Sequence, residues 1–314
     1  MLPIPTPDSL PAPIRHAGPQ ASWRFLDFFT ANIRNPHTRA AYLRVVRDFF
    51  AWAEARQITT LEDIRPIVVA AYIEDAGRRL SKPTVKQHLA AIRMLFDWLV
   101  TGQILAINPA AAVRGPRYSV RRGKTAVLSS EEVRTLLDSI ETTTLIGLRD
   151  RALIALMAYT FARVGAAISL KVEDYYIQQR RGWVRLSEKN GKLNQVPCHH
   201  NLEQFLEEWL AAADLKSQPR APLFPALRYG RVGTQPLAQP NVYLMIQRRA
   251  SAAGIATRIC CHSFRATGIT TYLKNGGKLE IAQQMAAHES PRTTSLYDRR
   301  NDDLTLDEIE RVLY

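Results

Sequence analysis

Apolar residues recur at every third or fourth position through most of the chain. They do so across 38–56 and again across 82–100, and this spacing predicts two amphipathic helices. A more uniformly apolar stretch at 148–159 predicts a buried helix. Helical patterns also fill 201–213, 240–252, 263–274, 278–287 and 304–313. We therefore expect residues 21–108 to be all helical, and the protein to be mainly α.

One segment departs from the helical pattern and predicts a β-hairpin. Residues 182–187 have the composition of a strand, and 195–197 begin its partner. The pair Asn190-Gly191 lies between them, and Asn-Gly favours the tight turn that joins two antiparallel strands. The expected fold class is an all-helical N-terminal domain joined to an α-rich second domain with a small antiparallel sheet.

Proline, glycine and charge mark the expected domain boundaries. Residues 1–20 contain six prolines and no apolar period, which predicts a flexible leader. Residues 109–126 are basic, contain glycine and proline and also lack a period, which predicts an interdomain linker. These segments delimit an N-terminal helical domain at 21–108 and a second domain at 127–314. The spacing Ser129-x-x-Glu132 is that of a capping box and indicates where the first helix of the second domain begins.

Composition and charge narrow the possible functions. The chain has 46% hydrophobic and 23% charged residues, a globular balance, and no apolar run reaches the roughly 18–20 residues of a membrane span. Its three cysteines imply no disulfide framework, which favours a reducing, cytoplasmic compartment. The net charge is +13, and residues 1–124 hold 18 basic and 9 acidic side chains against 24 and 20 in the rest. A basic excess in the N-terminal part indicates a polyanion, most simply nucleic acid.

Several basic side chains are candidates for contact with that polyanion. Lys82, Lys86 and Arg93 lie close together on the flank of one apolar stripe. Such a flank is equally consistent with a solvated face and with a surface that contacts phosphates. The candidate DNA-binding residues are Arg39, Lys82, Lys86, Arg93, Arg121 and Arg122.

Six residues of the second domain carry candidate chemistry, although each has an ordinary explanation when it is taken alone. The i, i+3 spacing of His262 and Arg265 places both on one helix face. Ser290-Pro291 predicts a helix start, so that Tyr297 would lie two turns into a short helix. The six, in chain order, are Arg163, Lys189, His262, Arg265, His288 and Tyr297.

Taken together, these residues resemble the pattern of the tyrosine recombinase family of phage-integrase and Xer type, over about residues 22–300. The N-terminal segments Asn35-Pro36-His37-Thr38, Ser81-Lys82-Pro83-Thr84 and Asn108-Pro109 are similar to the signature helices and exit of the family's SAM-like core-binding domain. The catalytic matches are Arg163 for the first arginine, Lys189 for the hairpin lysine, His262 and Arg265 for the His-x-x-Arg box, His288 for the His/Trp position and Tyr297 for the nucleophile.

The sequence departs from the family pattern at several positions. Phe161-Ala162 stands where the family usually has Gly-Leu, and Ala166 stands where an acidic residue is common. Ala286-Ala287 precedes His288 where Leu-Gly is common. Lys192, in the same turn as Lys189, is a rival for the catalytic lysine. No departure removes a reacting group.

The resemblance implies a fold of the DNA breaking-rejoining type and a site-specific recombinase. Tyr297 would attack a DNA phosphate to form a 3′-phosphotyrosyl intermediate. Arg163, Arg265, His262 and His288 would stabilise that phosphate, and Lys189 would be the general acid, with no metal or other cofactor. The implied partners are double-stranded recombination sites and further protomers, forming a homotetramer or heterotetramer with one dimer per site. The location implied is cytoplasmic and nucleoid-associated. The segment 302–314 could dock on a neighbour or pack in cis.

Two alternatives remain open from the sequence. A type IB-like topoisomerase would use the same Tyr/Arg/His/Lys chemistry as a monomer. A catalytically silent accessory factor would bind DNA without cutting it, and the complete set of six groups argues against it.

Overall fold

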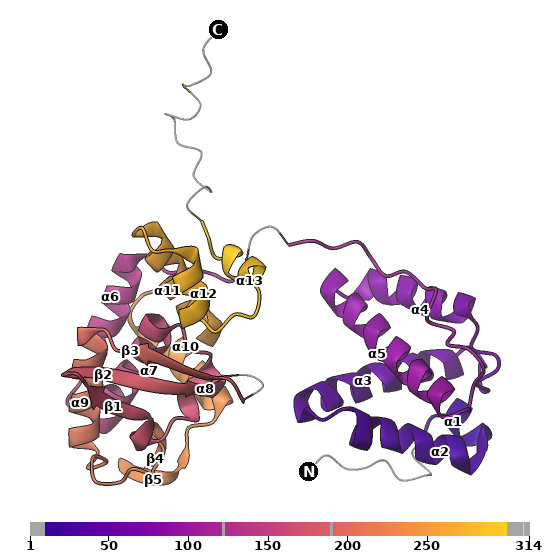
Figure 1. The fold of residues 1–314 in the computed structure, drawn as a ribbon, viewed down its shortest axis with the longest axis horizontal. Helices are drawn as coiled ribbons and strands as arrows, with labels where there is room; N and C mark the ends of the chain where they lie inside the picture. Colours follow the sequence, from indigo (N-terminus) through magenta and orange to yellow (C-terminus); the bar gives the residue numbers. More distant parts are fainter. Residues whose placement is uncertain (1–9, 121–122, 189–190, 300–309, 311–314) are drawn as a thin grey trace. The chain divides into compact units, whose positions relative to one another are not determined.

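The computed structural model describes residues 10–120, 123–188, 191–299 and 310, and it separates into two compact units, Met1–Ser119 and Val120–Tyr314 (Figure 1). Each unit has a hydrophobic core of its own. The protein is mainly helical. Among the described residues, strands occur only in the second unit, where they form small antiparallel sheets, so the predicted fold class is confirmed. Within these residues, no helix is both long and apolar enough to cross a membrane.

The first unit consists of helices packed around a cluster of aromatic rings. The α-helices are α1 (Ala12–His16), α2 (Gly18–Asp27), α3 (Pro36–Glu54), α4 (Pro66–Arg79) and α5 (Lys82–Thr101), and a π-helical turn, η2, covers Phe28–Asn32. The buried rings are Phe25, Phe28, Phe29, Phe49, Phe50, Tyr72 and Phe96. The helices predicted at 38–56 and 82–100 are confirmed as α3 and α5. Asn35 caps α3 because its side chain accepts hydrogen bonds from the backbone N–H groups of His37 and Thr38.

The N-terminal helices begin earlier than the sequence predicts. The range 1–20 was expected to be a flexible leader, yet α1 and the start of α2 lie within it. Leu10 and Ile14 are buried in the core of the first unit. Pro13 and Pro19 occupy the first turns of these two helices, where a missing N–H costs no hydrogen bond. The prolines that suggest an irregular leader therefore open two short helices.

The segment expected to be a linker begins on the surface of the first unit. Ala110 and Val113 are buried against its core. The guanidinium of Arg93, on α5, donates hydrogen bonds to the carbonyl oxygens of both residues. Residues 109–113 thus belong structurally to the helical unit, although they show no helical period.

The second unit surrounds one long buried helix. Its helices are α6 (Ser130–Asp138), α7 (Leu145–Thr160), α8 (Val164–Ile168), η3 (Val172–Asp174), α9 (His200–Ala212), α10 (Gln239–Ala252), α11 (Cys261–Lys274), α12 (Leu279–Met285) and α13 (Pro291–Ser295). The helix α7 is buried on almost every side, as its uniform apolar pattern predicts. The capping box at Ser129 and Glu132 is present at the start of α6.

The strands form two small sheets. Strands β1 (Tyr175–Gln178), β2 (Arg181–Ser187) and β3 (Leu193–Pro197) pair antiparallel in the order β1-β2-β3, which confirms the predicted hairpin. Asn194, on β3, donates a hydrogen bond of 2.8 Å to the carbonyl oxygen of Met285, at the end of α12. Strands β4 (Pro225–Arg228) and β5 (Arg231–Pro236) form a second hairpin. The sequence did not indicate it, because neither strand shows an alternation of buried and exposed residues.

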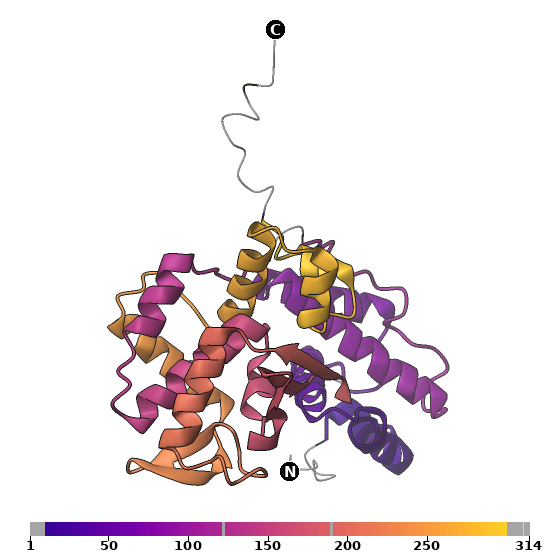
Figure 2. The ribbon, with the colours of Figure 1, turned by 60° about the vertical axis from the view of Figure 1, so that its left-hand side comes forward.

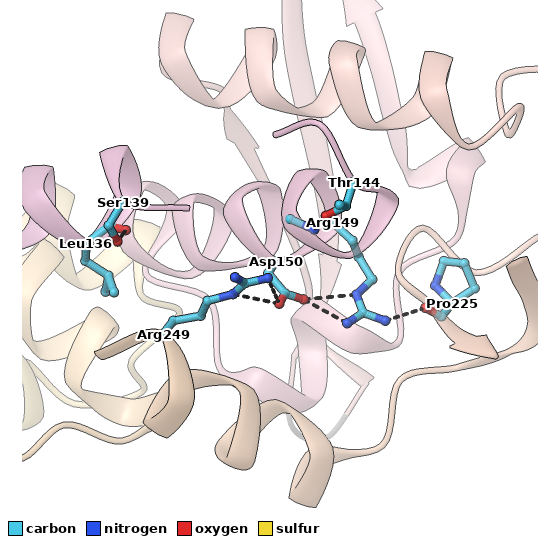
Figure 3. A network of polar contacts seen from close by, with 8 residues as sticks. Leu136, Ser139, Thr144, Arg149, Asp150, Pro225 and Arg249 are labelled. Carbon is cyan, nitrogen blue, oxygen red and sulfur yellow. Dashed lines mark hydrogen bonds and ion pairs between the residues drawn. The ribbon is translucent and has the colours of Figure 1, made fainter. Parts of the chain in front are cut away.

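A buried ion network holds the second sheet and α10 against α7 (Figure 3). The carboxylate of Asp150 is fully buried, and it accepts hydrogen bonds from Arg149 at 2.8 Å and from Arg249 at 2.9 Å. Arg149 also donates to the carbonyl oxygen of Pro225. Figures 1 and 2 both show β4 and β5 at the opposite end of this unit from α11, α12 and α13. The network therefore stabilises the end of the unit away from those helices.

Close contact between α11 and α7 requires glycine at position 268. A Cβ atom added there would lie 2.2 Å from the carbonyl oxygen of Ala158 and 2.6 Å from the ring of Phe161. We expect Gly268→Ala to lower the free energy of unfolding of the second unit by about 3 kcal/mol, because the packed helices cannot move apart freely. Chemical denaturation followed by circular dichroism would measure the loss.

Gly165, in α8, offers a matched control because a Cβ added there meets nothing within 4 Å. We expect Gly165→Ala to leave the stability unchanged or to raise it by up to about 1 kcal/mol. An equal effect of the two substitutions would contradict the close packing of α11 on α7.

Candidate active site

A left-handed turn after α7 brings the first candidate arginine into position. Helix α7 ends at Thr160, and Phe161 adopts φ of 58°. The chain then reverses so that Arg163 stands at the start of α8. The side chain of Phe161 is buried in a small apolar cluster with residues of α11 and α12. Burial of this ring anchors a backbone conformation that L-residues other than Asn and Asp rarely adopt.

Arg265 lies at the centre of the site and is 1% exposed. Its two terminal nitrogens donate to the carbonyl oxygens of Phe161 and Ala286, while its Nε is buried and has no hydrogen-bond partner. Burial, and next the charge of Arg163, lower its pKa to about 10, so it remains charged at neutral pH. A buried cation with an unused donor is suited to bind an anion.

Arg163 is held by an acidic residue that the sequence analysis did not identify. Its guanidinium forms an ion pair with Glu188, whose side chain is 2% exposed. The second carboxylate oxygen of Glu188 is buried without a partner. The residue three positions after Arg163 is Ala166, which cannot pair with it, and Glu188, directly after β2, pairs with it instead. In the sequence, the only indication of this role was that Glu188 is an acidic residue directly before the hairpin lysine.

The candidate nucleophile and a histidine are in direct contact. Nε2 of His262 lies 2.8 Å from the phenolic oxygen of Tyr297. Burial raises the pKa of Tyr297, and the charges of Arg265 and Arg163 oppose that rise. Partial burial and the same two arginines lower the pKa of His262. At neutral pH the phenol therefore keeps its proton and the imidazole is neutral, so Nε2 can accept that proton.

Tyr297 is fixed by its backbone rather than by a helix. The sequence predicts it two turns into a short helix, but α13 ends at Ser295. The N–H of Tyr297 donates to the carbonyl oxygen of Thr294 at 2.9 Å, and its own carbonyl accepts from the hydroxyl of Thr270 at 3.0 Å. The carbonyl of Leu296 accepts from the N–H of Gly123 at 2.9 Å. These three bonds replace the helical hydrogen bonds and direct the phenol towards His262.

His288 also contacts the tyrosine. Its ring stacks on that of Tyr297 with 5.8 Å between centroids and 9° between planes. Its Nδ1 lies 2.9 Å from the hydroxyl of Thr294. Burial, followed by the charges of Arg265 and Arg163, lowers the pKa of His288 to about 3. This ring is therefore neutral throughout the physiological range.

The structure describes one of the two candidate lysines. Lys189 lies outside the described residues. Lys192 is exposed directly before β3, and its carbonyl oxygen accepts a hydrogen bond of 2.7 Å from the N–H of Glu188. Lys192 is thus bonded through its backbone to the acid that pairs with Arg163.

The candidate DNA-binding residues also fall into distinct groups. Lys82 and Lys86 are exposed on α5. Arg39 donates to the carbonyl oxygen of Ile33, and Arg93 binds the chain at 110–113, so both guanidinium groups have structural partners. Arg121 and Arg122 lie outside the described residues.

Apart from the two lysines, the site brings together two cations, two neutral imidazoles and one phenol from four separate segments of the second unit. No group of three or more His, Cys, Asp or Glu among the described residues is arranged to hold a metal ion. The cations and the neutral imidazoles can donate hydrogen bonds to the oxygens of a phosphate, and the phenol with its adjacent base can attack it.

Comparison with known proteins gives matches across both units. The model of the phage integrase family matches residues 126–303, and that of the phage integrase N-terminal SAM-like domain matches residues 24–103. A tyrosine recombinase of Synechococcus elongatus is 29% identical over 304 residues, which cover 92% of this chain and 92% of that protein.

Solved structures show the same fold. The XerH site-specific recombinase, in a post-cleavage complex with a palindromic difH substrate, superposes with a TM-score of 0.72 and 20% identity, covering 95% of this chain and 86% of that one. A lambda integrase tetramer bound to a Holliday junction gives a TM-score of 0.65 and 19% identity, covering 85% of this chain and 76% of that one.

Proposed function

Because the chain belongs to the phage integrase family and is a tyrosine site-specific DNA recombinase, we propose that it cuts and rejoins DNA with Tyr297 as its nucleophile. The observation that carries this assignment is the 2.8 Å contact between the phenol and Nε2 of His262. Next to that pair, the buried Nε of Arg265 lacks a partner. A nucleophile, its base and an unused cationic donor are what attack on a phosphodiester requires.

In the proposed cleavage step, the phenolic oxygen of Tyr297 forms a bond to phosphorus as the bond from phosphorus to the 5′ oxygen breaks. The phenolic proton passes to Nε2 of His262. The products are a 3′-phosphotyrosyl link and a 5′-hydroxyl. One phosphoester bond replaces another, so the reaction needs no nucleotide hydrolysis, and attack by a partner strand's 5′-hydroxyl reverses the step on a new strand.

Arg163 and Arg265 stabilise the charge that develops on the phosphate oxygens. Both guanidinium groups are fixed before the substrate arrives, Arg265 by two backbone carbonyls and Arg163 by Glu188. Fixed charge of this kind needs no reorganisation during the reaction, and each donor contributes on the order of 3 kcal/mol of transition-state stabilisation.

A lysine of the β2–β3 turn supplies the proton for the leaving 5′ oxygen. We assign this role to Lys189, and Lys192 is the alternative in the same turn. The ion pair of Glu188 with Arg163 supports this assignment, because Glu188 directly precedes Lys189 in the sequence.

We also propose that the protein acts on double-stranded recombination sites as a tetramer of like or mixed protomers, with one dimer on each site. Support comes from the XerH structure, which holds a DNA substrate, and from the lambda integrase tetramer on a Holliday junction. We propose a cytoplasmic, nucleoid-associated location, since that is where such sites occur. The basic first unit would supply sequence-independent affinity for the DNA backbone.

Exchange between two DNA sites tests this function against relaxation by a topoisomerase. Duplexes with a randomised core and a nick can be incubated with the protein, and protease-sensitive covalent adducts sequenced to identify the site. Two copies of that site on one plasmid should then yield recombinant circles without ATP or metal ions. Relaxed plasmid without recombinants would contradict recombination and indicate a type IB-like topoisomerase.

A further inference from the structure

The buried hydroxyl of Thr294 lies 2.9 Å from Nδ1 of His288. We propose that Thr294 is a positioning residue: it donates to Nδ1 of His288, which leaves the proton on Nε2 and makes Nε2 a hydrogen-bond donor to the scissile phosphate. That the acceptor is a DNA phosphate rests on the proposed function. The position of the proton on the ring is argued from hydrogen bonds within the protein alone.

Hydrogen-bond satisfaction selects this tautomer. The side chain of Thr294 is fully buried, and its hydroxyl lies 2.9 Å from Nδ1 of His288. Within the described residues, the hydroxyl of Thr294 forms no other hydrogen bond. If Nδ1 carried the proton, the hydroxyl could only accept, and its own hydrogen would be buried without an acceptor at a cost of about 1–3 kcal/mol. If the hydroxyl donates, both groups are satisfied.

The other ring nitrogen is available to a ligand. Among the described residues, Nε2 of His288 forms no hydrogen bond. It is also not one of the side-chain atoms that are both fully buried and unpaired. A neutral imidazole with an acceptor at Nδ1 must carry its proton at Nε2. Burial beside Arg265 and Arg163 keeps the ring neutral, with a pKa of about 3. Nε2 can therefore donate to a phosphate oxygen without adding charge to the site.

Thr294 also links this donor to the nucleophile. The carbonyl oxygen of Thr294 accepts the N–H of Tyr297 at 2.9 Å, and the ring of His288 stacks on that of Tyr297. One residue thus holds the histidine through its side chain and the tyrosine through its backbone. The donor to the phosphate and the group that attacks it are positioned by the same short segment.

Nitrogen NMR of the full chain, labelled with ¹⁵N-histidine and free of DNA, reads the tautomer directly. Signals of His288 can be assigned by comparison with His288→Gln. We expect a pyridine-like shift for Nδ1 and a pyrrole-like shift for Nε2, unchanged between about pH 5 and 8 because the pKa of His288 is about 3. An Nδ1 that carries a proton, in a neutral ring or an imidazolium, would overturn the inference.

Substitutions test whether Thr294 causes that preference. Thr294→Val keeps the shape but removes the hydroxyl, and we expect it to weaken the Nε2–H preference and to slow DNA cleavage by at least about tenfold. Thr294→Ser should restore both. Thr293→Val is the matched control, since Thr293 is exposed in the same helix, and it should change neither. The other histidine signals, unchanged in each variant, would show that the fold is intact.

The outcomes separate this inference from the proposed function. A wild-type tautomer and wild-type cleavage in Thr294→Val would overturn the role of Thr294 while leaving Tyr297 as the nucleophile. The expected tautomer in a protein that never forms a covalent DNA adduct would instead refute the proposed function.

Discussion

Replacement of Arg163 by alanine is expected to slow DNA cleavage by about two to three orders of magnitude while DNA affinity changes by less than about tenfold. The guanidinium is fixed by Glu188 before DNA binds, and its charge acts on the negative charge that develops at the phosphate. We propose that the basic first unit supplies most of the affinity, and the substitution leaves that unit unchanged. Single-turnover cleavage of a nicked substrate and fluorescence anisotropy would measure the two quantities.

The same substitution leaves the carboxylate of Glu188 buried without its counter-charge, which lowers stability. The double variant Arg163→Ala/Glu188→Gln removes this complication, because the buried group is then neutral. We expect it to be more stable than Arg163→Ala and equally slow in cleavage. Equal losses of affinity and cleavage in both variants would show that Arg163 is a structural residue.

Replacement of Tyr297 by phenylalanine is expected to abolish the covalent adduct, a loss of at least about four orders of magnitude. Only the hydroxyl is removed, and the stacking of the ring on His288 remains possible. The variant should therefore fold and bind DNA as the wild type does. Electrophoresis of a nicked suicide substrate under denaturing conditions would detect the adduct.

Tyr229 offers the matched control for this substitution. It is fully exposed in the turn between β4 and β5, at the end of the unit away from Tyr297. Tyr229→Phe should form the adduct at the wild-type rate. An adduct of normal yield in Tyr297→Phe would show that another residue attacks the phosphate.

Local patterns were sufficient to predict much of the fold. The helices α3, α5, α7 and α11 and the β2–β3 hairpin all follow from periodicity or turn composition. The β4–β5 hairpin does not, because neither face of it is consistently buried. The start of α1 was hidden by prolines that usually indicate irregular chain. Each error arises where tertiary contacts, rather than local preference, decide the structure.

The candidate site shows the same division. The six matched residues were found from their order and spacing, but Glu188 and Thr294 were not. Glu188 contacts Arg163 from a segment 25 residues away, and no periodicity connects them. The hydroxyl of Thr294 contacts His288, which is placed by the loop between α12 and α13. A single sequence contains no signal for such contacts.

Two of the departures from the family pattern have a common physical cause. Phe161 and Ala287 both adopt positive φ, 58° and 46°, and the family usually has glycine at each of these two positions. Residues with a Cβ atom are strained in this conformation by about 1–2 kcal/mol. Both side chains are buried, Phe161 within an apolar cluster. Packing therefore stabilises turns that glycine would form without strain.

Net charge indicated the partner but not the contacts. Arg39 and Arg93 remain candidates for DNA binding, and both donate to backbone carbonyls of their own unit. Lys82 and Lys86 remain exposed on α5. In the second unit, the charges of Arg265 and Arg163 both lower the pKa of one tyrosine, Tyr297.

The chemical identity of the DNA–protein link tests the central claim most directly. The adduct trapped on a nicked substrate can be digested with nuclease and protease, and the modified peptide sequenced by mass spectrometry. We expect a single modified residue, Tyr297, that carries a nucleoside 3′-phosphate, with a free 5′-hydroxyl on the released strand. A link through any other residue, or through a 5′-phosphate, would contradict it.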